Sequence, residues 1–347
     1  MPEVVVITGG SAGVGRATAR AFAAAGYRVA ILARGASRVE EACAELESFG
    51  AEALGIVADV ADARQVDQAA ARVEKELGPI AVWVNNAATT IFAPVVNVSP
   101  AEFEQVTRVT YLGTVHGTLA ALRHMRGRNR GCIIQVGSAL AYRSIPLQSA
   151  YCASKAATRG FTDSLRSELI RERSAIRLVM VHLSAFNTPQ FDWARSRLVH
   201  RVQPVPPIFQ PEIAADAIVH AAKHPRRELW VGWPAVKAIL STRLLPGLGD
   251  RLAAGSAWDG QQTPEPAAAG RPDSLFEPVP GRQAAHGRFD ATSNARSLQW
   301  QLSKHRVAAG SLGIAALAAG IAAVLITSRA QRAGRGVAAG GGPQRLR

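Results

Sequence analysis

Short apolar runs alternate with longer amphipathic segments along the first 235 residues of the chain. The apolar runs have the length of strands and lack a polar alternation, which predicts strands that are buried on both faces. They are residues 4–7, 28–33, 53–57, 80–84, 132–136, 176–182 and 228–232. Segments of helical length and period lie between them, for example residues 38–49 and 62–77. This order predicts an α/β fold, a doubly wound parallel sheet of about seven strands with helices on both sides.

The composition changes near residue 250. Residues 255–300 contain Pro264, Pro266, Pro272, Pro278 and Pro280 among glycines, glutamines, alanines and charged residues, and this mixture offers little material for a core. We therefore expect one domain over residues 1–250 and interpret residues 251–305 as a Pro/Gly-rich linker draped on its surface.

An uncharged run of 21 residues, 307–327, follows this segment. As a helix it would be roughly 30 Å long, which matches the hydrocarbon core of a bilayer. Basic residues flank it at Lys304, Arg306 and Arg329. The pattern predicts a transmembrane helix over residues 306–328 and a basic tail over 329–347, with a soluble core helix as the alternative because the run is rich in Ala and Gly.

The formal net charge is +14, and residues 251–347 supply half of it with 12 Lys/Arg against 5 Asp/Glu. No nucleic-acid partner is predicted, since basic and aromatic residues do not interleave in a binding motif. The three cysteines neither cluster nor form an even set, which favours free thiols in a reducing compartment. His200, His220 and His224 have no further ligand residues at metal-binding spacing, and no metal site is predicted.

The first strand is followed by TGGSAGVG, residues 8–15, and then by an Ala-rich helix. Gly9, Gly13 and Gly15 allow the backbone to turn tightly and approach a pyrophosphate, whose charge the helix amides and the positive helix end would meet. A glycine-rich turn between a buried strand and a helix is a strong signal for a nucleotide.

Tyr151 and Lys155, in the stretch YCASK, stand four apart and share one face of a predicted helix. Together with the glycine pattern, Asp59-Val60, the run NNAA at 85–88 and Ser138, they resemble the short-chain dehydrogenase/reductases over roughly residues 3–235. This resemblance implies a Rossmann-type fold and an enzyme that interconverts a carbonyl and an alcohol with a nicotinamide dinucleotide.

The resemblance also implies the roles of individual residues. Ser138 would bind the substrate oxygen, Tyr151 would exchange a proton with it, and Lys155 would hold the nicotinamide ribose and lower the pKa of Tyr151. The cofactor-binding residues would be Thr8, Gly9, Ser11, Gly13, Val14, Gly15, Arg34, Asp59, Val60, Asn85, Ala87, Tyr151, Lys155 and Thr188.

Two positions depart from the family pattern. Thr110 stands where relatives carry an asparagine that holds water for the proton relay, and we assign Thr110 to the catalytic group. Leu183-Ser184 replace a Pro-Gly pair, whereas Thr188 is retained to meet the nicotinamide carboxamide. The first departure leaves a non-catalytic, membrane-tethered dinucleotide sensor or scaffold as an alternative.

The cofactor preference depends on the end of the second strand. Arg34 lies there with no acid nearby, and Arg16 follows the glycine turn. An arginine suits a 2′-phosphate and an acid suits a 2′-hydroxyl, so NADP(H) is expected over NAD(H). The alternative for Arg34 is an ordinary surface charge.

The insertion at 186–210 carries large apolar side chains that could form a lid over an apolar pocket or simply pack the insertion onto the domain: Phe186, Phe191, Trp193, Ile208 and Phe209. A lid would suit a lipophilic carbonyl or alcohol substrate. The apolar face of residues 235–245 could pack on its own domain, on a membrane or on a second copy in a homo-oligomer. His182 is expected to be a core histidine.

The N-terminal apolar run is too short for a signal peptide, and we expect the first segment to belong to the fold. The catalytic domain is therefore expected in the cytoplasm, where NADP(H) is available, and the chain at the membrane through its C-terminal segment. A spanning helix would carry the Arg-rich tail across the membrane, against the usual bias of positive charge. Either the tail crosses or the segment lies at the interface.

Overall fold

This computed structural model describes residues 2–305 except 269, 272 and 282–283. The chain divides into two units, residues 1–300 and 301–347, and the description below concerns the first. The predicted transmembrane helix at 306–328 and the basic tail lie outside the described residues. Within the described ranges, no helix combines the length and the apolar character needed to cross a membrane.

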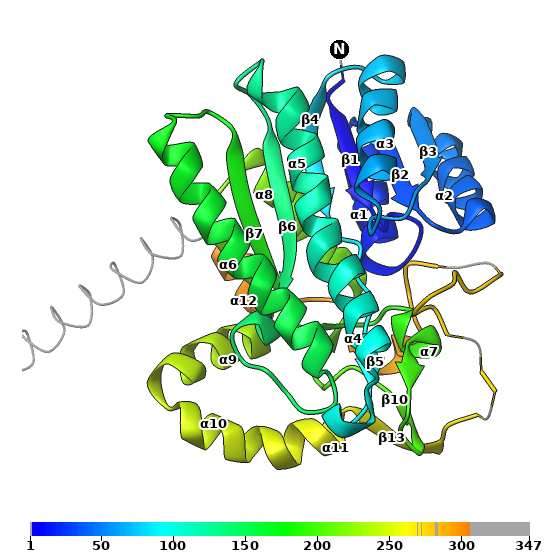
Figure 1. Ribbon diagram of the computed structural model, residues 1–347, viewed down its shortest axis with the longest axis vertical. Coiled ribbons are helices and arrows are strands. Elements are labelled where there is room, and N and C mark those ends of the chain that lie inside the picture. Colours follow the sequence, from blue (N-terminus) through cyan, green and yellow to red (C-terminus); the bar gives the residue numbers. More distant parts are fainter. Residues whose placement is uncertain (1, 269, 272, 282–283, 306–347) are drawn as a thin grey trace, which may run out of the picture. The chain divides into compact units, whose positions relative to one another are not determined.

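Seven parallel strands form the central sheet in the order β3-β2-β1-β4-β6-β7-β12 (Figure 1). Their bounds are β1 Val4–Thr8, β2 Arg28–Ala33, β3 Ala53–Val57, β4 Ile80–Asn85, β6 Cys132–Ser138, β7 Arg177–Leu183 and β12 Glu228–Val231. The predicted α/β fold with a seven-stranded parallel sheet is confirmed. The strands could be identified because they are apolar on both faces, as burial between two helix layers requires.

Helices cover both faces of this sheet. One apolar cluster joins the sheet to α1 (Gly13–Ala24), α2 (Ala36–Ser48) and α8 (Pro211–Lys223). A second cluster on the opposite face joins it to α3 (Ala63–Glu76), α5 (Gly113–Arg126) and α6 (Ser149–Arg171). The arrangement is therefore doubly wound, as the alternation of strands and helices predicts.

Local signals set the beginnings of several helices. Asp62 caps α3 by accepting hydrogen bonds from the amides of Arg64 and Gln65. Ser99 and Glu102 form a capping box at α4 (Pro100–Thr107), which also has proline in its first turn. The helix then continues through a π-helical turn, η2 (Arg108–Leu112), into α5.

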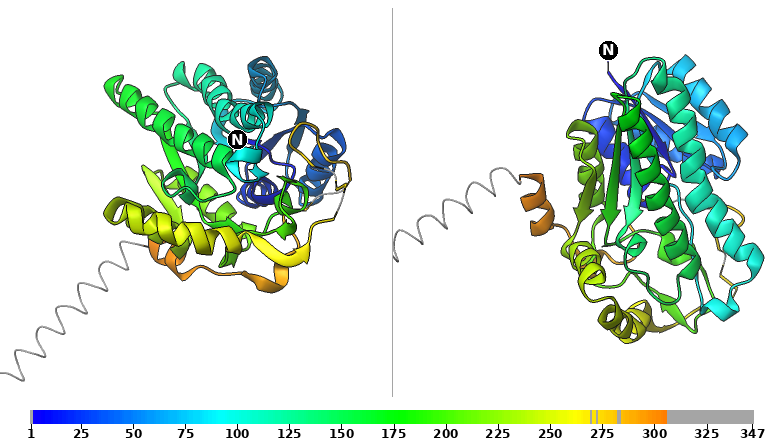
Figure 2. Two further views of the ribbon diagram at one scale, coloured as in Figure 1. Left: turned by 60° about the horizontal axis from the view of Figure 1, so that its bottom comes forward. Right: turned by 60° about the vertical axis from the view of Figure 1, so that its left-hand side comes forward.

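Shorter elements lie at the carboxyl ends of the strands and in the C-terminal part, and the left view of Figure 2 brings that edge of the sheet forward. They are β5 Ile91–Phe92, η1 Val95–Asn97, η3 Ala139–Ala141, β8 Ala185–Phe186, α7 Gln190–Trp193, β9 Arg195–Ser196, β10 His200–Val202, β11 Ile208–Phe209, α9 Trp233–Leu244, α10 Pro246–Leu252, η4 Ala253–Ala257, α11 Trp258–Gly260, β13 Gln262–Pro266, η5 Asp290–Thr292, β14 Ser293–Asn294 and α12 Leu298–Lys304.

Residues 251–300 pack as part of the domain and do not form the separate linker that their composition indicates. They belong to the same compact unit as residues 1–250. β13 pairs with β10, β14 pairs with β11, and the side chains of Leu275, Phe289 and Trp300 are buried. Prolines and glycines prevent a long periodic element here, but isolated apolar side chains still fill hollows of the preceding fold. A periodicity argument cannot detect such single contacts.

Trp300 provides the test of this packing. It is 1% exposed, its indole nitrogen donates to Asp216 at 2.7 Å, and its ring lies edge-on to His220. We expect Trp300→Ala to lower the free energy of unfolding by about 3–5 kcal/mol, measured by urea denaturation. Trp258→Ala, at a tryptophan that is 38% exposed, is the control and should cost less than about 1 kcal/mol. Equal effects of the two variants would contradict a core role for the segment.

Candidate active site

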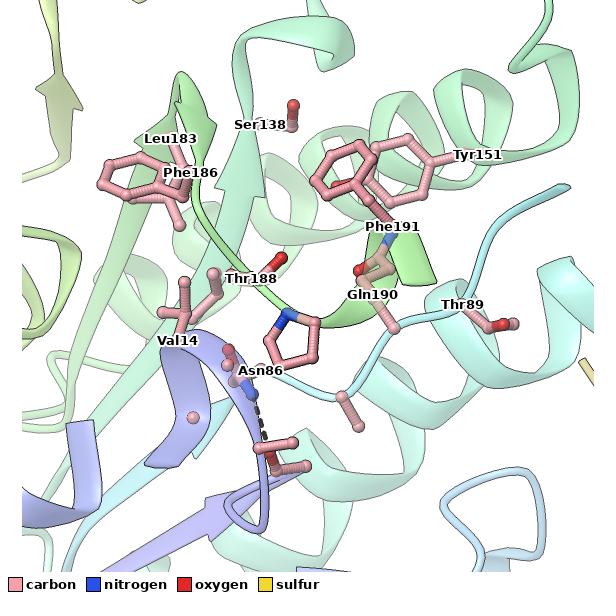
Figure 3. A pocket seen from close by; sticks show the side chains of 18 of the residues that line it. Val14, Asn86, Thr89, Ser138, Tyr151, Leu183, Phe186, Thr188, Gln190 and Phe191 are labelled. Atoms are coloured by element: carbon pink, nitrogen blue, oxygen red, sulfur yellow. Dashed lines mark hydrogen bonds between the residues drawn. The ribbon is translucent and has the colours of Figure 1, made fainter. Parts of the chain in front are cut away.

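A cavity of about 450 Å³ opens at the carboxyl ends of the strands, where the strand order reverses between β1 and β4. Figure 3 shows residues that line this cavity from the glycine turn and the start of α1 (Val14), the segment after β4 (Asn86, Thr89), the end of β6 (Ser138) and α6 (Tyr151). The sheet topology thus collects residues that are far apart in the sequence.

The glycine turn is shaped by close approach of backbone. Gly9 and Gly13 have positive φ angles of 66° and 56°. A side chain at Gly15 would place its Cβ 2.2 Å from the carbonyl oxygen of Gly9, which no larger residue could tolerate. Thr8 fixes the neighbouring turn, because its hydroxyl accepts hydrogen bonds from the amides of Asn86 and Ala87. The turn can therefore lie close to a bound phosphate group, as the sequence predicts.

Ser138, Tyr151 and Lys155 all line the cavity. Ser138 is the last residue of β6, and its hydroxyl accepts a hydrogen bond from the amide of Leu140 at 3.1 Å. Tyr151 and Lys155 follow from α6, and the ammonium nitrogen of Lys155 lies 5.6 Å from the centroid of the Tyr151 ring. The three side chains that the sequence selects are therefore brought together.

Burial is the largest cause of the pKa shifts of Tyr151 and Lys155. It raises the pKa of the Tyr151 phenol above its ordinary value, while a hydrogen bond with Ser138 acts in the opposite direction. Burial also lowers the pKa of Lys155 from 10.5 to about 8. The ammonium is 3% exposed and donates to the carbonyl of Val136 at 2.7 Å. The site thus holds a cation at neutral pH in an environment that disfavours charge.

His182, on β7, contacts the backbone of Ser138. It is fully buried, and its Nδ1 lies 3.1 Å from the carbonyl oxygen of Ser138. Because a carbonyl only accepts, this nitrogen carries the proton. Burial lowers the pKa of His182 to about 4, against the opposing charge of Glu228. The prediction of a core histidine is in line with this position.

Three predicted site residues do not line the cavity but support it. Thr8 holds the Asn86–Ala87 turn. The Asn85 amide donates to Thr118 and Gln135 within the core. The Thr110 hydroxyl donates to the carbonyl of Thr89 and accepts from its amide, both at 3.0 Å, so its single proton is already committed. A relay role for Thr110 stays a prediction.

The other predicted residues line the cavity: Gly9, Ser11, Gly13, Val14, Gly15, Arg34, Asp59, Val60, Ala87 and Thr188. Arg38, which lies on α2 four residues after Arg34, also lines the cavity. Arg34 is among the causes that lower the pKa of Arg38, after burial. In the described part of the chain, no carboxylate forms an ion pair with either guanidinium. Two adjacent cations without an acid favour an anion at this end.

Arg16 does not contribute to that end of the cavity. Its guanidinium is buried and forms ion pairs with Glu45 at 2.7 Å and Glu41 at 3.5 Å, on α2. The carboxylates on the facing helix already satisfy its charge. Arg16 therefore does not support the NADP(H) expectation, which rests on Arg34 and Arg38.

Some large apolar residues of the insertion at 186–210 line the cavity, and others pack the insertion onto the domain. Phe186, Phe191 and Trp193 line the cavity, whereas Ile208 and Phe209 are buried in a three-stranded sheet with β8 and β14. Further apolar walls come from Leu140, Ile145, Val205, Pro206, Ala235 and Ala238. Both interpretations are thus partly right, because β8 and β11 pair the two ends of the insertion with each other and β9 pairs its middle with β5.

Sequence reasoning missed several lining residues. Asn86, Thr89, Arg38, Gln148 and Gln190 all reach the cavity. Arg38 could have been found, since it stands four after Arg34 at the start of a predicted helix. Ser274 and Pro278 could not, because the chain returns to the site only in the tertiary structure.

Comparisons with known proteins agree with this geometry. A family model described as short chain dehydrogenase matches residues 3–197. An uncharacterized oxidoreductase, YxnA of Bacillus subtilis, is 33% identical over 279 residues, which cover 79% of this chain and 78% of that protein. A fatty acyl-CoA reductase of Acinetobacter baylyi is 32% identical over 228 residues, 65% of this chain and 75% of that protein.

Solved structures show the same fold. An alcohol dehydrogenase from the archaeon Thermococcus sibiricus, complexed with 5-hydroxy-NADP, superposes with a TM-score of 0.58 at 27% identity. The similarity covers 67% of this chain and 96% of that one. The rest of this chain has no counterpart in that alignment, so its role must be inferred from the contacts that it makes in this chain.

Lys155 offers a test of the buried charge. Below pH 8 both the folded and the unfolded chain bind its proton; between pH 8 and 10.5 only the unfolded chain does, so stability rises with pH in that window. Relative to Lys155→Met, the wild-type free energy of unfolding should gain about 3 kcal/mol from pH 7.5 to 10.5. Lys75→Met, at an exposed lysine, is the control. A difference that does not change with pH would argue against a buried ammonium.

Proposed function

The chain belongs to the short-chain dehydrogenase/reductase family, whose members act on CH–OH or C=O groups with a nicotinamide dinucleotide, and within it we propose an NADP(H)-dependent oxidoreductase of lipophilic substrates. The observation that carries the proposal is the convergence of Ser138, Tyr151 and Lys155 on the cavity that the glycine turn also lines. The name of one relative, a fatty acyl-CoA reductase, is consistent with an apolar substrate.

The residues of the cavity fit a dinucleotide. The glycine turn can approach the pyrophosphate closely, and the guanidinium groups of Arg34 and Arg38 lie at the opposite end from Tyr151 along the strand order. When bound, the nicotinamide supplies or accepts the hydride, which no side chain can carry.

The side chains of the chain then manage the proton. The Ser138 hydroxyl would donate to the substrate oxygen, and the Tyr151 phenol would give a proton to that oxygen in reduction or take one in oxidation. The ammonium of Lys155 would stabilise the phenolate and bind the nicotinamide ribose. Burial raises the pKa of Tyr151 and the Ser138 hydrogen bond lowers it, so the ammonium of Lys155 would have to lower it further for proton exchange near neutral pH.

NADP(H) is favoured over NAD(H) by the paired guanidinium groups. A 2′-phosphate is a dianion near neutral pH and suits bidentate arginine donors, whereas a 2′-hydroxyl does not require them. The lipophilic substrate is supported by the apolar walls from Leu140, Ile145, Phe186 and Phe191 near Ser138. The membrane tether stays a prediction that rests on the uncharged run at 307–327.

The competing function is a dinucleotide sensor or scaffold without turnover. Thr110 in place of the usual asparagine is the feature that favours it, because the Thr110 hydroxyl is engaged by Thr89. The intact Ser138, Tyr151 and Lys155 favour the enzyme.

Replacing Tyr151 by Phe distinguishes the two functions. Loss of the proton donor should lower kcat by about 10²–10⁴-fold, with NADPH as reductant and a panel of aromatic and medium-chain ketones as substrates. NADPH affinity, followed by fluorescence titration, should change less than about twofold. Tyr27→Phe, at a tyrosine that packs on Phe22, is the control. If the wild-type chain binds NADPH but reduces none of the ketones, the sensor is the better description.

Replacing Arg34 by Ala tests the cofactor preference. Loss of a charge-assisted contact should raise the Kd for NADP⁺ by about tenfold or more, measured by isothermal titration calorimetry. The Kd for NAD⁺ should stay within about twofold, since it has no 2′-phosphate. Arg64→Ala, at a side chain that is 90% exposed, is the matched control. An equal loss of affinity for NADP⁺ and NAD⁺ would refute a contact between Arg34 and the 2′-phosphate.

A further inference from the structure

Residues 273–278, which we call the strap, lie against the arginine end of the cavity. The guanidinium of Arg34 donates to two of their backbone carbonyls, from NH1 to Phe276 and from NH2 to Ser274, both at 2.7 Å. Ser274 and Pro278 also line the cavity. The strap comes from the C-terminal part of the chain, outside the region 3–197 that the family model matches. Both terminal nitrogens of Arg34 are thus engaged by this segment.

The strap is anchored on its other side, away from Arg34. The carboxylate of Asp273 accepts from Arg195 at 2.9 Å, and Arg195 also pairs with the buried Glu102. Inside the strap, the Leu275 amide donates to the Asp273 side chain at 3.0 Å, which fixes the turn. These contacts fasten the strap at points other than its two bonds to Arg34.

Two further contacts complete the anchor. The side chain of Leu275 is fully buried against Ile91 and Val106, and the amide of Gln105, on α4, donates to the Leu275 carbonyl at 3.1 Å. The amide of Ser274 donates to the carbonyl of Trp193 at 2.9 Å. The strap is therefore fastened to α4 and to the insertion.

A 2′-phosphate and the strap need the same donors. A phosphate dianion binds a guanidinium more strongly than a neutral carbonyl does, and its negative charge is repelled by carbonyl oxygens that point at the same group. If Arg34 turns to the phosphate while the strap stays anchored, the carbonyls of Ser274 and Phe276 lose their donors. Unsatisfied polar groups raise the free energy of that state.

We propose that the strap and the cofactor 2′-phosphate compete for Arg34, so that the anchoring of residues 273–278 sets the preference between NADP(H) and NAD(H). This inference uses the cofactor site of the proposed function and assigns a specificity role to a segment outside the matched family region. NAD(H) leaves the bonds between Arg34 and the strap in place. NADP(H) requires that the strap release the arginine, and a firm anchor makes this release more costly.

Loosening the anchor should therefore favour NADP⁺. In the full-length chain, Asp273→Ala removes the bond between the strap and Arg195 and the turn acceptor, and leaves Arg34 unchanged. The ratio Kd(NAD⁺)/Kd(NADP⁺), measured by isothermal titration calorimetry, should rise by about tenfold, the effect of about one charged hydrogen bond. The Kd for NAD⁺ should stay within about twofold. Gln105→Ala should act in the same direction, since it frees the Leu275 carbonyl.

The matched control is Asp67→Ala, which breaks an ion pair with Arg123 between α3 and α5 and should leave the ratio unchanged. If the strap merely covered the cofactor, Asp273→Ala would weaken the binding of NAD⁺ and NADP⁺ alike. That result, or an unchanged ratio Kd(NAD⁺)/Kd(NADP⁺), overturns the proposal. Failure of the proposed function has a different outcome, because there the wild-type chain itself would bind NAD⁺ more tightly than NADP⁺.

Hydrogen exchange of the wild-type chain gives an independent measurement if Asp273→Ala does not fold. The amides of Ser274 and Leu275 both donate hydrogen bonds, so they report whether the strap is held. Saturating NADP⁺ should speed their exchange severalfold relative to saturating NAD⁺. Equal exchange with the two cofactors would contradict the release of the strap.

Discussion

Parallel pairing brings the carboxyl ends of β1, β2, β4 and β6 to one edge of the sheet, and the rest of the site depends on this constraint. The strand order reverses between β1 and β4, so the chain leaves these two strands toward opposite faces and a crevice remains between them. The glycine turn and the Asn86–Ala87 turn each directly follow a strand, and Ser138 is the last residue of one, so all three meet there. Other lining residues, such as Phe191, Val205 and Ser274, come from the insertion and the C-terminal segment.

The cavity concentrates positive charge in an environment that disfavours charge. Lys155 is buried beside Val136, and Arg38 is buried near Arg34. Perturbed groups of this kind gather at functional sites, since a stable fold alone would place such cations in water. In the function proposed above, an anionic cofactor would relieve this cost at the arginine end, and the Lys155 ammonium would assist proton exchange with the phenol of Tyr151 at the other end. The apolar walls between Leu140 and Phe191 keep the dielectric low, which strengthens both effects.

The two halves of the chain contribute differently to the cavity. Residues 3–197 match the family and supply the glycine turn, Ser138, Tyr151 and Lys155. The later residues, including Val205, Ala238, Ala257 and Ser274, line the remaining parts of the cavity. Within this later part, α8 and β12 belong to the sheet domain, whereas residues 251–300 are held by single buried side chains such as Leu275 and Trp300.

The sequence by itself determined the seven strands, the two helix layers, and the residues of the glycine turn and of YCASK, because apolar periodicity and short spacings are local properties that the chain carries in any state. Only the tertiary structure decided that Arg16 is neutralised by Glu41 and Glu45, that the Thr110 hydroxyl is engaged by Thr89, and that residues 251–300 fill part of the core. Arg34 shows the difference most clearly: the acceptors of its guanidinium stand 240 and 242 residues away. Such pairs have no period and no fixed spacing, so they exist only once the sheet has brought distant segments within hydrogen-bonding distance.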